Sequence, residues 1–198
     1  MILHLPDEQE SGTNSNAGVL DSYISRIVTG DKEALALLYR ATSASVYGFA
    51  LSILKNTQDA EDVLHDSYIA VYSSACTYRS AGKPMAWVLT ITRNLCLQKL
   101  RERKKMADVL PENWETGLES RREISEDDKL VISECMNRLS DMERQIIALH
   151  AIAGFKHREI ADLLHIPLST VLSKYNRAIK KLKKYLGKES KSDDKSGN

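Results

Sequence analysis

Apolar residues recur at spacings of three and four along most of this chain, which is the pattern of α-helices that bury one face. The clearest run follows Asp31, a residue type that caps helix N-termini, and continues to Ile53. Its apolar stripe consists of Leu35, Leu38, Tyr39, Thr42, Val46, Phe49, Ala50 and Ile53. The sequence has no run of alternating apolar and polar positions of the kind that a half-buried strand requires. The pattern therefore predicts an all-α fold.

Three further helices are predicted in the first half of the chain. A weaker apolar pattern covers Val19 to Val28. Asn56 and Thr57 interrupt the long helix and can cap another, whose inward stripe is Ala60, Val63, Leu64, Ser67, Tyr68, Val71 and Tyr72. A loop is expected from about Cys76 to Lys83. Pro84 suits a first helical turn, and the helix that it opens ends in a block of Arg and Lys residues.

The second half contains two capping signatures and a helix-turn-helix pattern. Ser125 to Asp128 precede an apolar stripe that runs to Leu139, and Ser140 with Glu143 forms a capping box for the next helix. Residues 156–164 then read as a short helix, residues 165–167 break the register, and a longer helix follows.

These elements divide the chain into two small helical domains joined by a flexible linker. The first domain is expected over residues 18–105 and the second, a helix-turn-helix domain of winged-helix-like, four-helix form, over residues 126–188. The acidic linker, residues 106–125, contains Pro111 and Gly117. Residues 1–17 and 189–198 are polar, and we expect them to be disordered tails.

The last predicted helix has the two faces of a DNA-recognition helix. Its inward stripe is Val171, Tyr175, Ala178, Ile179 and Leu182, and its outward face carries Ser169, Thr170, Ser173, Lys174, Asn176, Arg177 and Lys181. In a helix-turn-helix, early residues of the second helix reach base edges and later cations meet phosphates. A basic amphipathic helix with a solvated lysine face is the alternative. The short helix and turn that precede it favour DNA binding.

Charge is segregated along the chain, although the formal net charge is only +1. One basic block lies between Arg93 and Lys105 and another between Lys174 and Lys188, and residues 108–128 between them are mainly acidic. Two basic surfaces joined by an acidic segment are typical of a protein that contacts one polyanion at two places.

The sequence offers few residues for other chemistry. Cys76, Cys96 and Cys135 are widely spaced, which predicts reduced, mostly buried thiols and neither a disulfide framework nor a zinc site. His150, His157 and His165 lack the spacing of metal ligands, so we interpret them as surface or turn residues. No nucleophile is paired with a base, so we expect no enzymatic activity, no cofactor and no metal. Without a signal peptide or an apolar segment of about 20 residues, we expect a cytoplasmic protein.

Four motifs in the two halves together resemble one family. Residues 56–72 (NTQDAEDVLHDSYIAVY) and 83–94 (KPMAWVLTITRN) resemble two helices of sigma region 2. Residues 139–144 (LSDMER) and the helix-turn-helix from Ile160 to Ala178 resemble sigma region 4. The chain is thus similar, over about residues 21–187, to the extracytoplasmic-function (ECF) sigma factors of bacterial RNA polymerase, the short members with regions 2 and 4. It departs from them at His165, where a turn glycine is usual, and at Leu172, where a basic residue is common.

The resemblance implies that region 2 melts the promoter −10 element and that region 4 reads the −35 element. It assigns the pocket for an unstacked −10 base to the loop with Tyr78, Arg79 and Lys83. Nearby, it implies contacts to the DNA backbone from Arg93, Asn94, Arg101 and Arg103. Unstacking a base costs a few kcal/mol, which binding of the extruded base must offset.

The resemblance also implies that core RNA polymerase is a partner, with region 2 on its clamp and region 4 on its flap. Asp59, Asp62, His65 and Asp66 form a face that is too negative for DNA, and we expect it to contact the clamp. A merely solvated face is the alternative. An anti-sigma factor, often a membrane-anchored one, is a further implied partner.

A different function remains open from the residues alone. A conventional helix-turn-helix regulator would carry a sensor domain in residues 21–105 and would bind duplex DNA without polymerase. The Trp87–Asn94 motif followed by a basic block argues against it.

Overall fold

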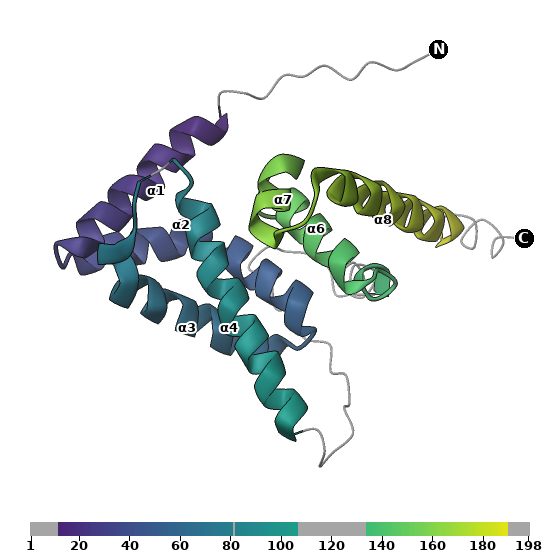
Figure 1. Ribbon diagram of the computed structural model, residues 1–198, viewed down its shortest axis with the longest axis horizontal. Coiled ribbons are helices and arrows are strands. Elements are labelled where there is room, and N and C mark those ends of the chain that lie inside the picture. The colour runs from purple at the N-terminus through teal and green to yellow at the C-terminus, as the bar shows by residue number, and fades with distance from the viewer. Residues whose placement is uncertain (1–11, 81, 107–133, 190–198) are drawn as a thin grey trace, which may run out of the picture.

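The computed structural model describes residues 12–80, 82–106 and 134–189, and all regular elements in these ranges are helical. The elements are α1 (Gly12–Val28), α2 (Lys32–Leu54), α3 (Thr57–Ser74), the 3₁₀ helix η1 (Ala75–Thr77), α4 (Pro84–Met106), α6 (Asp141–Ala151), α7 (His157–Leu164) and α8 (Leu168–Glu189). Residues 134–137 are also helical. Helices α1 to α4 form one group and α6 to α8 a second group beside it (Figure 1).

Three of these helices begin where the sequence predicts, each capped by the side chain of the residue before its first turn. The Asp31 carboxylate accepts hydrogen bonds from the backbone N–H groups of Glu33 at 2.9 Å and Ala34 at 3.2 Å. The Asn56 side chain accepts one from the N–H of Asp59 at 2.9 Å. Ser140 and Glu143 form the expected capping box at the start of α6. Each side chain satisfies a backbone donor that has no partner within its helix.

Some expectations need correction. Helix α1 begins at Gly12, inside the segment 1–17 that its polar composition marks as disordered, so that prediction is wrong for residues 12–17. Tyr72, expected on the buried stripe of α3, is 45% exposed. The all-α prediction, in contrast, is confirmed, and no strand occurs in residues 134–189 of the second half. Met106 and Glu189, expected in the linker and the second tail, are instead the last residues of α4 and α8. Residues 107–125 of the expected linker, residues 1–11 and 190–198 of the tails, and residues 126–133 of the second domain lie outside the described residues.

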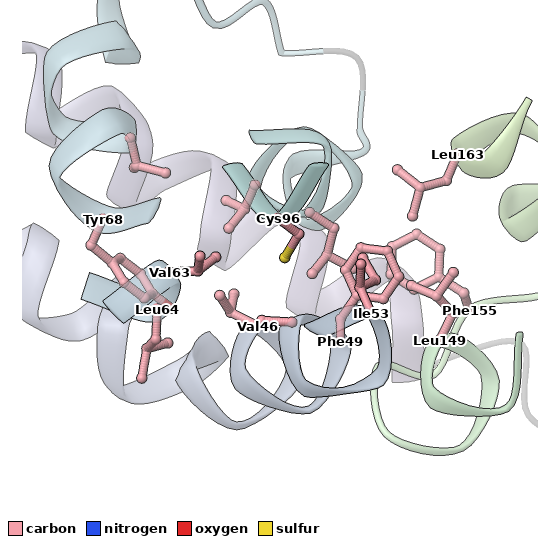
Figure 2. Packing of buried hydrophobic residues seen from close by; sticks show 14 of the residues in the cluster. Val46, Phe49, Ile53, Val63, Leu64, Tyr68, Cys96, Leu149, Phe155 and Leu163 are labelled. Carbon is pink, nitrogen blue, oxygen red and sulfur yellow. The ribbon is translucent and has the colours of Figure 1, made fainter. Parts of the chain in front are cut away.

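The two helical groups share a continuous apolar core. In the first half it is formed by residues of all four α-helices, including Ile24, Leu38, Val63 and Leu89. It continues without interruption to Leu149, Phe155 and Leu163 of the second half, which lie near Phe49 and Ile53 of α2 (Figure 2). A smaller cluster of Leu139, Ile147 and Ala178 joins α6 to α8.

Polar contacts accompany this seam between the halves. Lys55, which ends α2 in a left-handed conformation, forms an ion pair with Asp141 at 2.6 Å. The Ser45 hydroxyl donates to the carbonyl of Ile152 at 3.3 Å. Gly48 lies directly against Ile152, because a Cβ atom on Gly48 would be 3.0 Å from Ile152 Cδ1. The absence of a side chain at Gly48 thus lets the C-terminal end of α6 approach α2.

Candidate nucleic-acid interface

The turn between α7 and α8 is built without glycine. His165 caps the C-terminus of α7, and its φ of 55° and ψ of 46° are left-handed values that glycine adopts more easily. The N–H of Ile166 donates to the carbonyl of Ala161 at 3.1 Å, and the Pro167 carbonyl accepts from Thr170 at 2.9 Å. Helix α8 therefore starts in a fixed direction relative to α7.

Helix α8 buries one face and exposes the other, as its sequence predicts. Val171 and Ala178 are fully buried and fasten the helix to α6 and α7. Ser169, Ser173, Asn176 and Arg177 are exposed, and Thr170 and Lys174 are half-buried beside them. Leu172 is 41% exposed on this outer side. The Arg177 guanidinium lies 3.5 Å from the Ser173 hydroxyl, a weak contact that leaves it able to turn toward a ligand.

Lys181 differs from the other members of the expected DNA-binding face. Its ammonium group lies 2.6 Å from the carboxylate of Glu143, which is buried in the capping box of α6. Burial raises the pKa of Glu143, but hydrogen bonds from Lys181 and Ser140 outweigh this and hold the pKa below its ordinary value. Lys181 thus anchors α8 to α6, because a buried carboxylate needs a cation.

Two histidines support the start of the helix-turn-helix. The rings of His150 and His157 stack with centroids 4.7 Å apart, and Tyr175 meets them edge-on at 4.9 Å and 4.6 Å. Burial, and then the neighbouring His150, lower the pKa of His157, which favours the neutral ring. The interpretation of both residues as surface or turn histidines is therefore wrong, whereas His165 is exposed in the turn.

The loop between η1 and α4 carries the residues expected to hold an unstacked base. Arg79 is exposed, and Lys83 forms a loose ion pair with Asp162 of α7 at 3.6 Å. The Tyr78 ring packs on Trp87 of α4 with centroids 4.9 Å apart, and its hydroxyl donates to the Asp21 carboxylate of α1. Sequence reasoning missed Asp21, because 57 residues separate it from Tyr78.

Helix α4 presents part of the expected basic surface. Asn94 and Arg101 are exposed and lie two turns apart on one side of α4, and Arg93 is half-buried. Arg103 instead pairs with Asp59 of α3. Asp59 also pairs with Lys99 at 3.2 Å, and Asp62 pairs with Lys99 at 2.6 Å. These ion pairs fasten the basic end of α4 to the acidic start of α3.

The outer face of α3 is both acidic and apolar. His65 and Asp66 are exposed, and Asp62 is 55% exposed despite its pairing with Lys99. Ile69 and Tyr72, one and two turns further along, are 64% and 45% exposed. We call the residues Asp62, His65, Asp66, Ile69 and Tyr72 the α3 face. Asp59 does not belong to it, because only 14% of its side chain is exposed.

The burial of Asp59 predicts that it matters for stability. Asp59→Ala should lower the free energy of unfolding by about 1.5–3 kcal/mol, because it leaves Lys99 and Arg103 without their shared carboxylate at the α3 N-terminus. The matched variant Asp66→Ala, at an exposed position on the same helix, should change it by less than about 0.5 kcal/mol. Urea unfolding followed by circular dichroism measures both, and equal values would contradict a structural role for Asp59.

Other kinds of site find no support in the part of the chain that the structure describes. Those residues include no group of three or more His, Cys, Asp or Glu side chains placed to hold a metal ion. Among the helices in these ranges, none combines the length and the apolar character that crossing a bilayer requires. Cys96 and Cys135 are buried, as expected, whereas Cys76 is exposed.

Two family models match different parts of the chain. The family model of Sigma-70 region 2 matches residues 38–106, and that of Sigma-70 region 4 matches residues 129–182. The chain is 27% identical over 175 residues to the ECF RNA polymerase sigma factor SigK of Mycobacterium sp. (strain KMS), covering 85% of this chain and 91% of that protein. It is 25% identical over 183 residues to SigK of Mycobacterium ulcerans (strain Agy99), covering 89% and 98%.

Solved structures share the fold. The sigma factor RpoE of Bartonella quintana, in complex with the anti-sigma factor NepR, aligns with a TM-score of 0.67 at 21% identity, covering 75% of this chain and 94% of that one. CnrH, in complex with the cytosolic domain of CnrY, aligns with a TM-score of 0.62 at 18% identity, covering 85% and 97%. With both family models matched in order, one on each side of the seam, the chain belongs to the ECF group of RNA polymerase sigma factors.

Proposed function

We propose that this chain binds core RNA polymerase and directs transcription initiation through three surfaces: the outer side of α8, the loop of residues 78–83 with α4, and the α3 face. The observation that carries the proposal is the α7–turn–α8 unit. It buries Val171 and Ala178 and turns a polar, basic side outward, as a helix that enters the major groove must.

The outer side of α8 is proposed to read the −35 element. Ser169, Thr170 and Ser173 lie in its first two turns, where a recognition helix reaches base edges. Lys174, Asn176 and Arg177 follow, and Lys184 extends the basic side toward phosphates. Because Lys181 is engaged by Glu143, any phosphate contact from it would compete with that ion pair.

The loop of residues 78–83 and the exposed side of α4 are proposed to hold the melted −10 strand. Tyr78 offers an aromatic ring for stacking, and Arg79 and Lys83 offer cations for the backbone. Arg93, Asn94 and Arg101 of α4 would extend the contact. The ion pair between Lys83 and Asp162 is more than half exposed on both sides and therefore easy to exchange for a phosphate.

The α3 face is proposed to contact the polymerase clamp. Exposed Ile69 and Tyr72 follow Asp62 and Asp66 along α3, and this combination of apolar and acidic residues suits burial against a basic protein surface. Region 4 would meet the polymerase flap.

The closed arrangement of the two halves has a consequence for this function. The names of the −35 and −10 elements place them about 25 base pairs apart, or roughly 85 Å of duplex at 3.4 Å per base pair. In the structure, Lys83 of the loop and Asp162 of the helix-turn-helix are 3.6 Å apart. The halves must therefore separate before both elements are occupied.

We further propose that an anti-sigma factor regulates the chain in the cytoplasm. One structural relative was solved with the anti-sigma factor NepR, and another with the cytosolic domain of CnrY. A partner that binds both halves would favour the closed arrangement over the open one, in proportion to its difference in affinity for the two.

The experiment that tests the function also separates it from the regulator alternative. Promoter fragments are titrated with the chain alone and with the chain plus core polymerase. A sigma factor should bind specifically at low concentration with core polymerase and weakly without it. Tight, specific duplex binding by the chain alone would favour the regulator.

Arg177 is the strongest candidate for base readout, because its guanidinium can make two hydrogen bonds to a guanine edge. Arg177→Ala should cost the holoenzyme about 1–3 kcal/mol in binding and relax its preference at one −35 position. Lys184→Ala should instead weaken binding to every sequence and reduce the salt dependence by about one unit of slope. A panel of single-base −35 variants measures both, and equal losses on all sequences would make Arg177 a phosphate contact.

A further inference from the structure

A single carboxylate of helix α1, that of Asp21, binds two residues of the loop that precedes α4. Asp21 accepts a hydrogen bond from the Tyr78 hydroxyl on Oδ1 and one from the Ser80 hydroxyl on Oδ2 at 3.0 Å. Both carboxylate oxygens are thus used, and each holds a different residue of the loop. Helix α1 precedes the residues 38–106 that the region 2 model matches, so this contact comes from outside the matched segment.

The contact fixes the orientation of an aromatic ring. The Tyr78 ring lies against Trp87 at an interplanar angle of 50°, and its hydroxyl is held by Asp21. Burial, together with the bond to Asp21, raises the pKa of Tyr78 far above its ordinary value, so the hydroxyl stays protonated and continues to donate. Tyr78 is nevertheless only half-buried, which leaves part of the ring accessible.

We propose that Asp21 is a positioning residue for capture of the −10 strand: it orders Tyr78 and Ser80 before DNA arrives. This inference rests on the proposed function of the loop. A loop that is already ordered loses less conformational entropy when a base stacks on it, so the bound state is favoured. Asp21 does not itself touch the base; it acts through the tyrosine hydroxyl and the serine hydroxyl.

The test uses the full chain bound to core polymerase and a single-stranded oligonucleotide that carries the −10 sequence. Asp21→Ala should weaken oligonucleotide binding about tenfold, because the loop must then be ordered on binding. Tyr78→Phe, which keeps the ring and removes the donor, should cause an equal or smaller loss, because Ser80 keeps its hydrogen bond to Asp21. The double variant should bind no more weakly than Asp21→Ala, because Asp21→Ala has already removed the hydrogen bond that Tyr78→Phe removes. Asp21→Asn, which keeps an acceptor oxygen, should bind nearly as well as the unchanged chain.

Two controls separate positioning from a general structural role. Ser25→Ala, on the same helix, removes a hydroxyl that bonds to the backbone carbonyl of Asp21 and should leave binding unchanged. Duplex binding at the −35 element should be the same for all variants, because α8 lies far from α1 in the fold (Figure 1).

Three results would overturn the proposal: normal oligonucleotide binding by Asp21→Ala, additive losses in the double variant, or an equal loss at the −35 element. Failure of the proposed function has a different signature. The unchanged holoenzyme would then not retain the −10 oligonucleotide at all, and the proposed role of Asp21 would be rejected together with the proposed function.

Discussion

Ile69→Asp is expected to weaken binding of the chain to core RNA polymerase by at least about 30-fold, which corresponds to roughly 2 kcal/mol. Ile69 is the most exposed large apolar side chain of the described residues, at 64%, and belongs to the α3 face. If that face is buried on the clamp, an aspartate at this position loses its hydration without gaining a partner. The acidic residues of the face, Asp62 and Asp66, would remain in place.

The matched control for this variant is Val28→Asp. Val28 is 52% exposed at the end of α1, on a different helix from the α3 face, and its replacement should change the affinity by less than about twofold. Fluorescence titration of labelled chain with core polymerase measures both variants, and circular dichroism confirms that each remains helical. Unchanged affinity for Ile69→Asp would exclude the α3 face from the polymerase interface.

Gly48→Gln is expected to open the closed arrangement of the two halves. A Cβ atom at this position would lie 3.0 Å from Ile152 Cδ1 and 3.3 Å from Ile152 Cγ2, so a longer side chain collides with Ile152 unless Ile152 or α6 moves away from α2. Within α2 itself the change is favourable by up to about 1 kcal/mol, because glycine is a poor helix former. The substitution therefore acts against docking and not against the first half.

Small-angle X-ray scattering should show a larger radius of gyration for Gly48→Gln than for the unchanged chain. Because the fraction of chains competent to bind rises, the holoenzyme should form at a lower chain concentration. Gly18→Gln is the control, since a Cβ atom there meets nothing within 4 Å. Identical scattering for the two variants would show that the seam at Gly48 does not hold the halves together.

The sequence predicted best those features that depend on near neighbours along the chain. Asp31, Asn56 and Ser140 cap their helices as expected, because capping joins residues two or three positions apart. The inward positions Val171 and Ala178 of α8 follow in the same way from helical periodicity.

Interactions between distant parts of the chain could not be predicted in this way. The contacts of Asp59 with Lys99 and of Glu143 with Lys181 join residues some 40 positions apart, and nothing in the local pattern pairs them. As a result, charged residues that the pattern assigns to outward faces can instead form ion pairs that hold two helices together. Periodicity also fails at the edge of a buried stripe, where Tyr72 is exposed although its neighbour Val71 is fully buried.

Run-off transcription with purified core polymerase tests whether the chain directs initiation from promoters. Genomic fragments are transcribed with core polymerase alone, with the chain added, and with the chain added to fragments whose −35 or −10 element is scrambled. We expect discrete transcripts that require the chain and are lost when either element is scrambled. If the chain binds these fragments without polymerase and no chain-dependent transcript appears, the assignment of its surfaces to promoter recognition within a holoenzyme is contradicted.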